Sequence, residues 1–136
     1  MADEKQSTRD RWQTQARGAL DKLRGQVDEL RVQADLAQAE ARDRLQQGVE
    51  GLRGGEAKAK VKLDEAQAAG ADAWKNVARQ AEQVVDDLGD AFSKLASEVQ
   101  AAVGKAGAAA SKGRDAFLEE WKKDRADREK LLDETA

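Results

Sequence analysis

The sequence lacks several residue types on which protein chemistry commonly depends. Its 136 residues contain no cysteine, no histidine, no tyrosine and no proline. Without cysteine there is no disulfide framework and no thiolate nucleophile. Without histidine and tyrosine, the usual general acids and bases are scarce. The serines and carboxylates that remain lie in no base motif, calcium loop or phosphate-binding loop. We therefore expect a protein that is not an enzyme and that has no metal and no cofactor.

The missing residues also restrict the fold. Long helices tolerate little proline, because each proline removes a backbone donor and clashes with the preceding turn. Strand formers are scarce as well, and no segment alternates apolar and polar residues as a half-buried strand would. Aromatic residues make up only 4% of the chain, while charged residues make up 38%. An Ala-rich, charged and helical composition is typical of coiled coils and long helices.

Neither a long apolar run nor an excess of one charge is present. The longest run of small apolar residues is near residues 108–110, far too short to cross a membrane. The first residues are charged and include no apolar signal segment. Twenty-four basic and 27 acidic residues are mixed along the chain, whereas a nucleic-acid-binding protein usually has a basic face. We expect a cytoplasmic protein without a nucleic-acid partner or a transmembrane segment.

Apolar residues at steps of three and four predict the first long helix, over residues 7–53. Its stripe consists of Leu23, Val27, Leu30, Ala34, Ala37 and Ala41 and continues at Leu45, Val49 and Leu52. The pair Gly54–Gly55 follows, and glycine commonly ends helices. A tight turn at 54–55 would make the next helix an antiparallel neighbour.

The rest of the chain predicts a second arm and a short tail. A stripe including Leu63, Val77, Val84, Leu88 and Leu95 indicates a helix over 56–103. The Gly- and Ala-rich stretch 104–113 is predicted as a hinge, with continuous helix as the alternative, and a charged helix follows over 114–133. The predicted fold is all-α: a single domain, 1–136, built as a long antiparallel helical hairpin (coiled coil) with a short C-terminal third helix, and open to oligomerisation.

Five aromatic residues are the candidate interaction residues: Trp12, Trp74, Phe92, Phe117 and Trp121. Aromatic side chains combine a large apolar area with, in tryptophan, a hydrogen-bond donor, so they suit binding surfaces. In an Ala-rich assembly they can equally be anchors that fill the space where three helices meet. The sequence leaves both alternatives open.

The segment Asp72-Ala73-Trp74 and the segment Val84-Val85-Asp86-Asp87-Leu88-Gly89-Asp90-Ala91-Phe92 carry a family resemblance. Within residues 72–95 the chain resembles small bacterial coiled-coil stress-response proteins. That resemblance implies a cytoplasmic, non-enzymatic protein. The Gly-rich stretch and the Trp121 tail depart from the family's pattern.

The expected function is that of a coiled-coil structural or interaction protein that acts through helix–helix association, with itself or with another helical protein. The alternative is an amphipathic protein that binds a peripheral lipid or granule surface, similar to phasins or apolipoproteins. A third interpretation is a chain that folds only on dehydration.

Overall fold

Four helices make up the described part of a computed structural model of the chain. The backbone is described for residues 2–104 and 108–133, and side chains are described for residues 8–104 and 113–133. The helices are α1 (Ala2–Ala34), α2 (Ala39–Ala68), α3 (Trp74–Val103) and α4 (Ala108–Asp133). Within these residues there is no strand, and the prediction of an all-α fold is confirmed.

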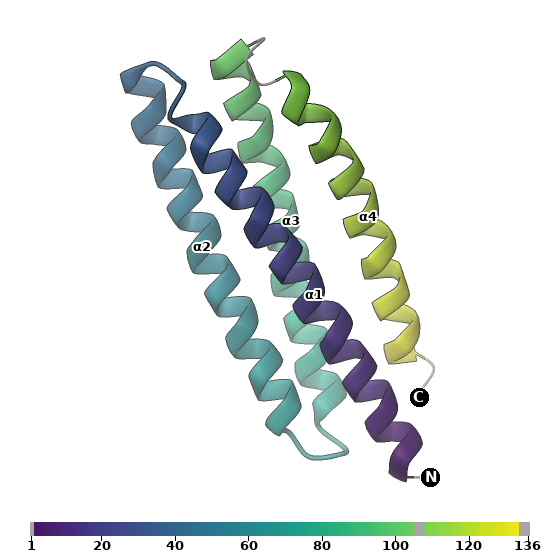
Figure 1. Cartoon of the computed structure of the whole chain (residues 1–136). Coiled ribbons are helices and arrows are strands. Elements are labelled where there is room, and N and C mark those ends of the chain that lie inside the picture. Colours follow the sequence, from purple (N-terminus) through teal and green to yellow (C-terminus); the bar gives the residue numbers. More distant parts are fainter. Residues whose placement is uncertain (1, 105–107, 134–136) are drawn as a thin grey trace.

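The helices lie side by side as a bundle and alternate in direction along the chain (Figure 1). α2 packs against α1 and α3, and so does α4. The first and last helices are therefore neighbours. Lys22 of α1 donates a hydrogen bond to Glu120 of α4 over 2.7 Å, which lowers the pKa of the Glu120 carboxyl and raises that of the Lys22 amine.

A single cluster of buried side chains runs along the middle of the bundle, and every helix contributes one stripe to it. Leucine and alanine dominate the stripes of α1 and α2, while the bulky aromatic rings come from Trp12 of α1 and from α3 and α4. Burying a leucine or phenylalanine contributes roughly 1.5–3 kcal/mol, whereas an alanine contributes much less. Alanine and glycine also let helix backbones approach closely, and this close packing recovers part of the difference in burial free energy.

The predicted turn at 54–55 is wrong, because Gly54 and Gly55 lie inside α2. Gly55 is used for close packing and not for a special backbone conformation: a Cβ on Gly55 would lie 2.8 Å from Leu88 Cδ1. Gly104 is the only described residue with a positive φ. The prediction of a two-armed hairpin, with helices over 7–53 and 56–103, is therefore wrong as well. This part of the chain forms the three helices α1, α2 and α3, and the connections between them lie elsewhere.

The first break separates α1 from α2 at residues 35–38, where the sequence has neither glycine nor proline. The amides of Leu36 and Ala37 donate to the carbonyls of Gln33 and Ala34 over 3.0 and 3.1 Å, so the helix ends in tight turns. The second break covers residues 69–73 and contains Gly70, whose carbonyl accepts from the amides of Ala73 and Trp74. Both connections are short and join antiparallel neighbours.

The predicted hinge at 104–113 agrees with the structure only at its start. α3 ends at Val103, and Gly104 caps it with a φ of 66°, a conformation in which glycine carries no steric penalty. Residues 105–107 lie outside the described residues. Residues 108–113 are helical and belong to α4, so the last helix begins six residues earlier than the predicted 114–133.

Candidate interaction surface

All five aromatic candidates lie inside the bundle. Trp12 and Phe92 are fully buried, and Trp74, Trp121 and Phe117 are 3%, 5% and 8% exposed. They form two separate groups. The rings of Trp12 and Trp74 are 6.3 Å apart, while Phe117 lies 5.6 Å from Phe92 and 5.7 Å from Trp121. The five aromatic side chains are therefore anchors between helices, and none of them exposes a ring to a partner.

A buried ion pair joins the Trp12 group to α4. Arg128 Nε donates to Glu82 Oε1 over 2.7 Å, and Trp12 Nε1 donates to the same oxygen over 2.9 Å. Arg128 is fully buried and Glu82 is 7% exposed. This pair was not predicted from the sequence, because charged residues at helical spacing normally lie on solvated faces. The available signal was position: Glu82 falls on one stripe with Ala78, Val85 and Phe92.

Arg9 of α1 holds the connection between α2 and α3. Its Nη1 donates to the carbonyls of Ala69 and Gln67 over 3.0 and 3.3 Å. Its guanidinium carbon lies 5.3 Å from the centre of the Trp74 ring, within the range of a cation–π contact. These contacts hold the connection between α2 and α3 against α1.

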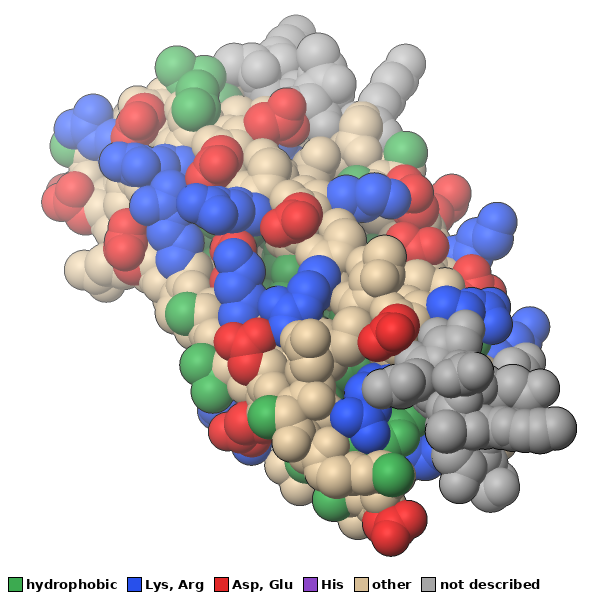
Figure 2. All heavy atoms as spheres, turned by 60° about the horizontal axis from the view of Figure 1, so that its bottom comes forward, with side chains coloured by type: hydrophobic (Ala, Val, Ile, Leu, Met, Phe, Trp, Pro, Cys, Tyr) green, Lys and Arg blue, Asp and Glu red, His purple; other side chains and the backbone are tan. Residues whose placement is uncertain are grey.

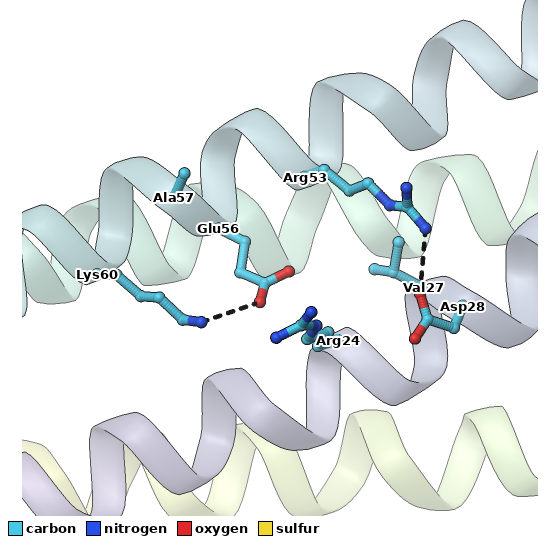
Figure 3. Close-up of a pocket in the computed structure, with 7 residues that line it drawn as sticks. All are labelled: Arg24, Val27, Asp28, Arg53, Glu56, Ala57 and Lys60. Atoms are coloured by element: carbon cyan, nitrogen blue, oxygen red, sulfur yellow. Dashed lines mark hydrogen bonds and ion pairs between the residues drawn. The ribbon is translucent and has the colours of Figure 1, made fainter.

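A polar cavity of about 340 Å³ lies between α1 and α2 (Figure 3). Its charged side chains are Arg24, Asp28, Arg53, Glu56 and Lys60. Arg53 pairs with Asp28 at 3.2 Å, and Lys60 lies 3.8 Å from Glu56. Each carboxylate therefore already has a cation nearby, and the set is explained as an ion network that connects the two helices.

A second hollow, the α2–α3 groove, has an apolar floor and a volume of about 560 Å³. Its lining residues are Gly48, Gly51, Leu52, Gly55, Lys58, Val84, Asp87, Leu88, Ala91, Lys94, Leu95 and Glu98. The floor exists because leucines of α3 pack against glycines of α2. A Cβ on Gly48 would lie 2.6 Å from Leu95 Cδ1, just as Gly55 accommodates Leu88. Gly51, between them, is exposed and has nothing within 4 Å of a Cβ.

Four charged residues line the groove: Lys58, Asp87, Lys94 and Glu98. Within the described residues, Lys58, Lys94 and Glu98 form no hydrogen bond and no ion pair, and Asp87 accepts only a hydrogen bond from Gln83 over 3.0 Å. In contrast, the charges around the α1–α2 cavity include two ion pairs. The α2–α3 groove thus combines an apolar floor with charges that are free to pair with something else.

The remaining surface offers few apolar alternatives. Val32, Leu36 and Val61 are the large apolar side chains exposed in the described part of the chain. On the face seen in Figure 2, basic and acidic side chains are interspersed. None of the described helices is long and apolar enough to cross a membrane. The described residues also contain no group of histidine, cysteine or acidic side chains arranged to hold a metal ion.

Comparison of the chain with models of known protein families, with curated proteins and with solved structures gave no match. The resemblance within residues 72–95 therefore remains an expectation. The candidate site rests on the geometry of the bundle alone.

Proposed function

We propose that this protein is a non-enzymatic interaction protein that acts through helix–helix association, and that the α2–α3 groove is its docking surface. The observation that carries the proposal is the hollow over the buried leucines Leu52, Leu88 and Leu95, with exposed small residues at its centre and charges at its rim that have no ion-pair partner. A neighbouring helix suits such a surface, because its apolar side chains fill the hollow at Gly51 and Ala91 and its charges pair with the rim.

The dimensions of the groove favour a helix as the occupant. The lining residues of α3 run from Val84 to Glu98, about 21 Å at a rise of about 1.5 Å per residue. Four turns of a docked helix match that length. Gly51 and Ala91 lie between the leucines and are exposed, so a partner backbone can approach closely at the middle of the groove.

A photo-cross-linking amino acid at Gly51 tests the proposal in cells that produce the protein. The substitution Gly51→p-benzoylphenylalanine fits the fold, because a side chain at this position points into open space. The matched control is the same amino acid at Thr14, an exposed residue of α1 outside the groove. We expect a discrete protein adduct from position 51 and none from position 14, with mass spectrometry placing the attachment on a helical segment.

Two results would contradict the proposal. The first is the absence of an adduct that depends on the groove position. The second is labelling of lipid in place of protein, which would support the alternative of a surface-binding amphipathic protein.

A further inference from the structure

We infer that the occupant of the α2–α3 groove is a second copy of this chain, and that the two α3 helices cross antiparallel about a two-fold axis next to Ala91. This inference rests on the proposed function and specifies its partner.

The groove side of α3 repeats at the spacing of an antiparallel helix pair. Leu88 and Leu95 already pack on Gly55 and Gly48 of α2. The groove residues of α3 that remain exposed or half-buried follow one another at steps of three and four, the pattern of a helix that packs lengthwise on another helix: Val84, Asp87, Ala91, Lys94 and Glu98. The central residue of this stripe is Ala91, which is small and exposed. Helix axes approach to about 8 Å where the facing residues are small.

Two opposite charges on this side of α3 are complementary to the same two charges of a second copy. Asp87 and Lys94 are exposed and lie seven residues apart, on the same face of α3 and on opposite sides of Ala91. An antiparallel two-fold contact brings Asp87 of each copy next to Lys94 of the other. A two-fold interface must be self-complementary in this way, because each of its contacts occurs twice.

Within one molecule these two residues cannot satisfy each other. Seven residues correspond to about 10.5 Å along the helix, too far for an ion pair. Lys94 has no ion pair or hydrogen bond among the described residues, and Asp87 accepts only from Gln83. A second copy supplies the missing partner for both.

The groove is small for a permanent dimer. A contact about 21 Å long buries an area at the lower end of specific interfaces, where association is reversible and depends on concentration. We therefore expect monomer and dimer to exchange, and their ratio to shift with protein concentration and with salt.

A single cysteine tests the symmetry axis, because the native sequence has none. In the antiparallel arrangement the two Ala91 Cα atoms face each other within about 6 Å, the range in which a disulfide forms. Ala91→Cys should therefore form a disulfide-linked dimer under mild oxidation, much faster than the control variant Thr14→Cys. Equal rates for the two variants would overturn the inference.

Charge exchange tests the pairing by sedimentation equilibrium on the full chain. Asp87→Lys alone places two lysine pairs at the interface and should raise the dimer dissociation constant about tenfold. Adding Lys94→Asp restores opposite charges and should return the constant to near the wild-type value. Glu119→Lys, an equal charge change at an exposed position of α4, should leave it within about twofold.

The circular dichroism spectrum of each variant should remain helical, so that a change in association is not a change in folding. A purely monomeric wild-type protein at the highest soluble concentration, or a double variant that stays as weak as Asp87→Lys, would overturn the dimer. If position 51 cross-links to a helix of a different protein while Ala91→Cys forms no dimer, the inference fails and the proposed function stands.

Discussion

Glu82 and Arg128 occupy positions in the bundle where apolar side chains would pack more simply. Burying two charges costs free energy that their attraction does not necessarily recover. The pair has a different effect, because sliding or rotating α4 against α3 would leave both charges buried and unpaired. The hydrogen bond from Trp12 to Glu82 extends this constraint to α1. The three residues thereby fix the relative placement of three helices.

Removing one member of this pair should cost far more than removing both. We expect Arg128→Met to lower the free energy of unfolding by about 3–5 kcal/mol, since Glu82 would keep a buried charge without a cation. Combining it with Glu82→Gln should recover most of the loss, because glutamine still offers Trp12 an acceptor oxygen. Urea unfolding followed by circular dichroism measures each variant.

A control for this cycle is the exposed ion pair of Arg79 and Asp133, whose side chains are 55% and 72% exposed. Asp133→Asn should change the free energy of unfolding by less than about 1 kcal/mol. Equal losses for Arg128→Met alone and for the double variant would show that the charge of Glu82 is not what makes Arg128 necessary.

At the scale of the helices, glycine has two opposite effects. Gly54 is exposed within α2 and has nothing within 4 Å of a Cβ, so it only weakens the helix. Gly89 of α3 is buried, and a Cβ there would collide with the rigid indole ring of Trp121. Gly55 is an intermediate case: a Cβ there would crowd Leu88 Cδ1, but the end of the Leu88 side chain can move aside.

These differences predict substitutions of opposite sign. Gly54→Ala should raise the free energy of unfolding by about 0.5–1 kcal/mol, the usual gain for alanine inside a helix. Gly89→Ala should lower it by about 1–3 kcal/mol, because Trp121 must leave its position. Thermal unfolding of both variants measures the two effects. Destabilisation by Gly54→Ala would mean that residue 54 lies in a turn and that α2 is not continuous.

The sequence predicted the helical class and much of the core, because apolar spacing is a local property. Leu63, Leu88 and Leu95 were placed on buried stripes and are buried. It could not place the breaks. Apolar spacing continues through Ala34 and Ala37 across the first break, whereas the conspicuous Gly54–Gly55 pair lies inside α2, where Gly55 packs against Leu88 of α3.

The candidate site was less predictable than the core. Aromatic residues drew attention, but burial is a property of the whole bundle and the sequence alone could not decide it. The groove depends on which glycines of α2 lie opposite which leucines of α3. The alignment of α2 with α3 depends on where the chain breaks between helices. Because those breaks were predicted at the wrong residues, the groove could not be predicted.

At the scale of the whole molecule, all three tryptophans are buried inside the bundle, with exposed fractions of 0%, 3% and 5%. A protein that opens onto lipid would have to separate these helices and expose the aromatic stripes. We expect the free protein to be strongly helical in dilute buffer. We also expect that its tryptophan emission and its quenching by acrylamide do not change when anionic lipid vesicles are added. A spectral shift or altered quenching with vesicles would favour the lipid-binding alternative.

The contact between α1 and α4 has a consequence for connectivity. The two ends of the described chain lie at the same end of the bundle (Figure 1). Chains of this kind tolerate circular permutation, because a short linker between the native ends replaces a connection opened elsewhere. The exposed Asp35 and Leu36, in the break between α1 and α2, mark a suitable place for the new ends. In such a permutant α2 would come first and α1 last, and every helix would keep its neighbours.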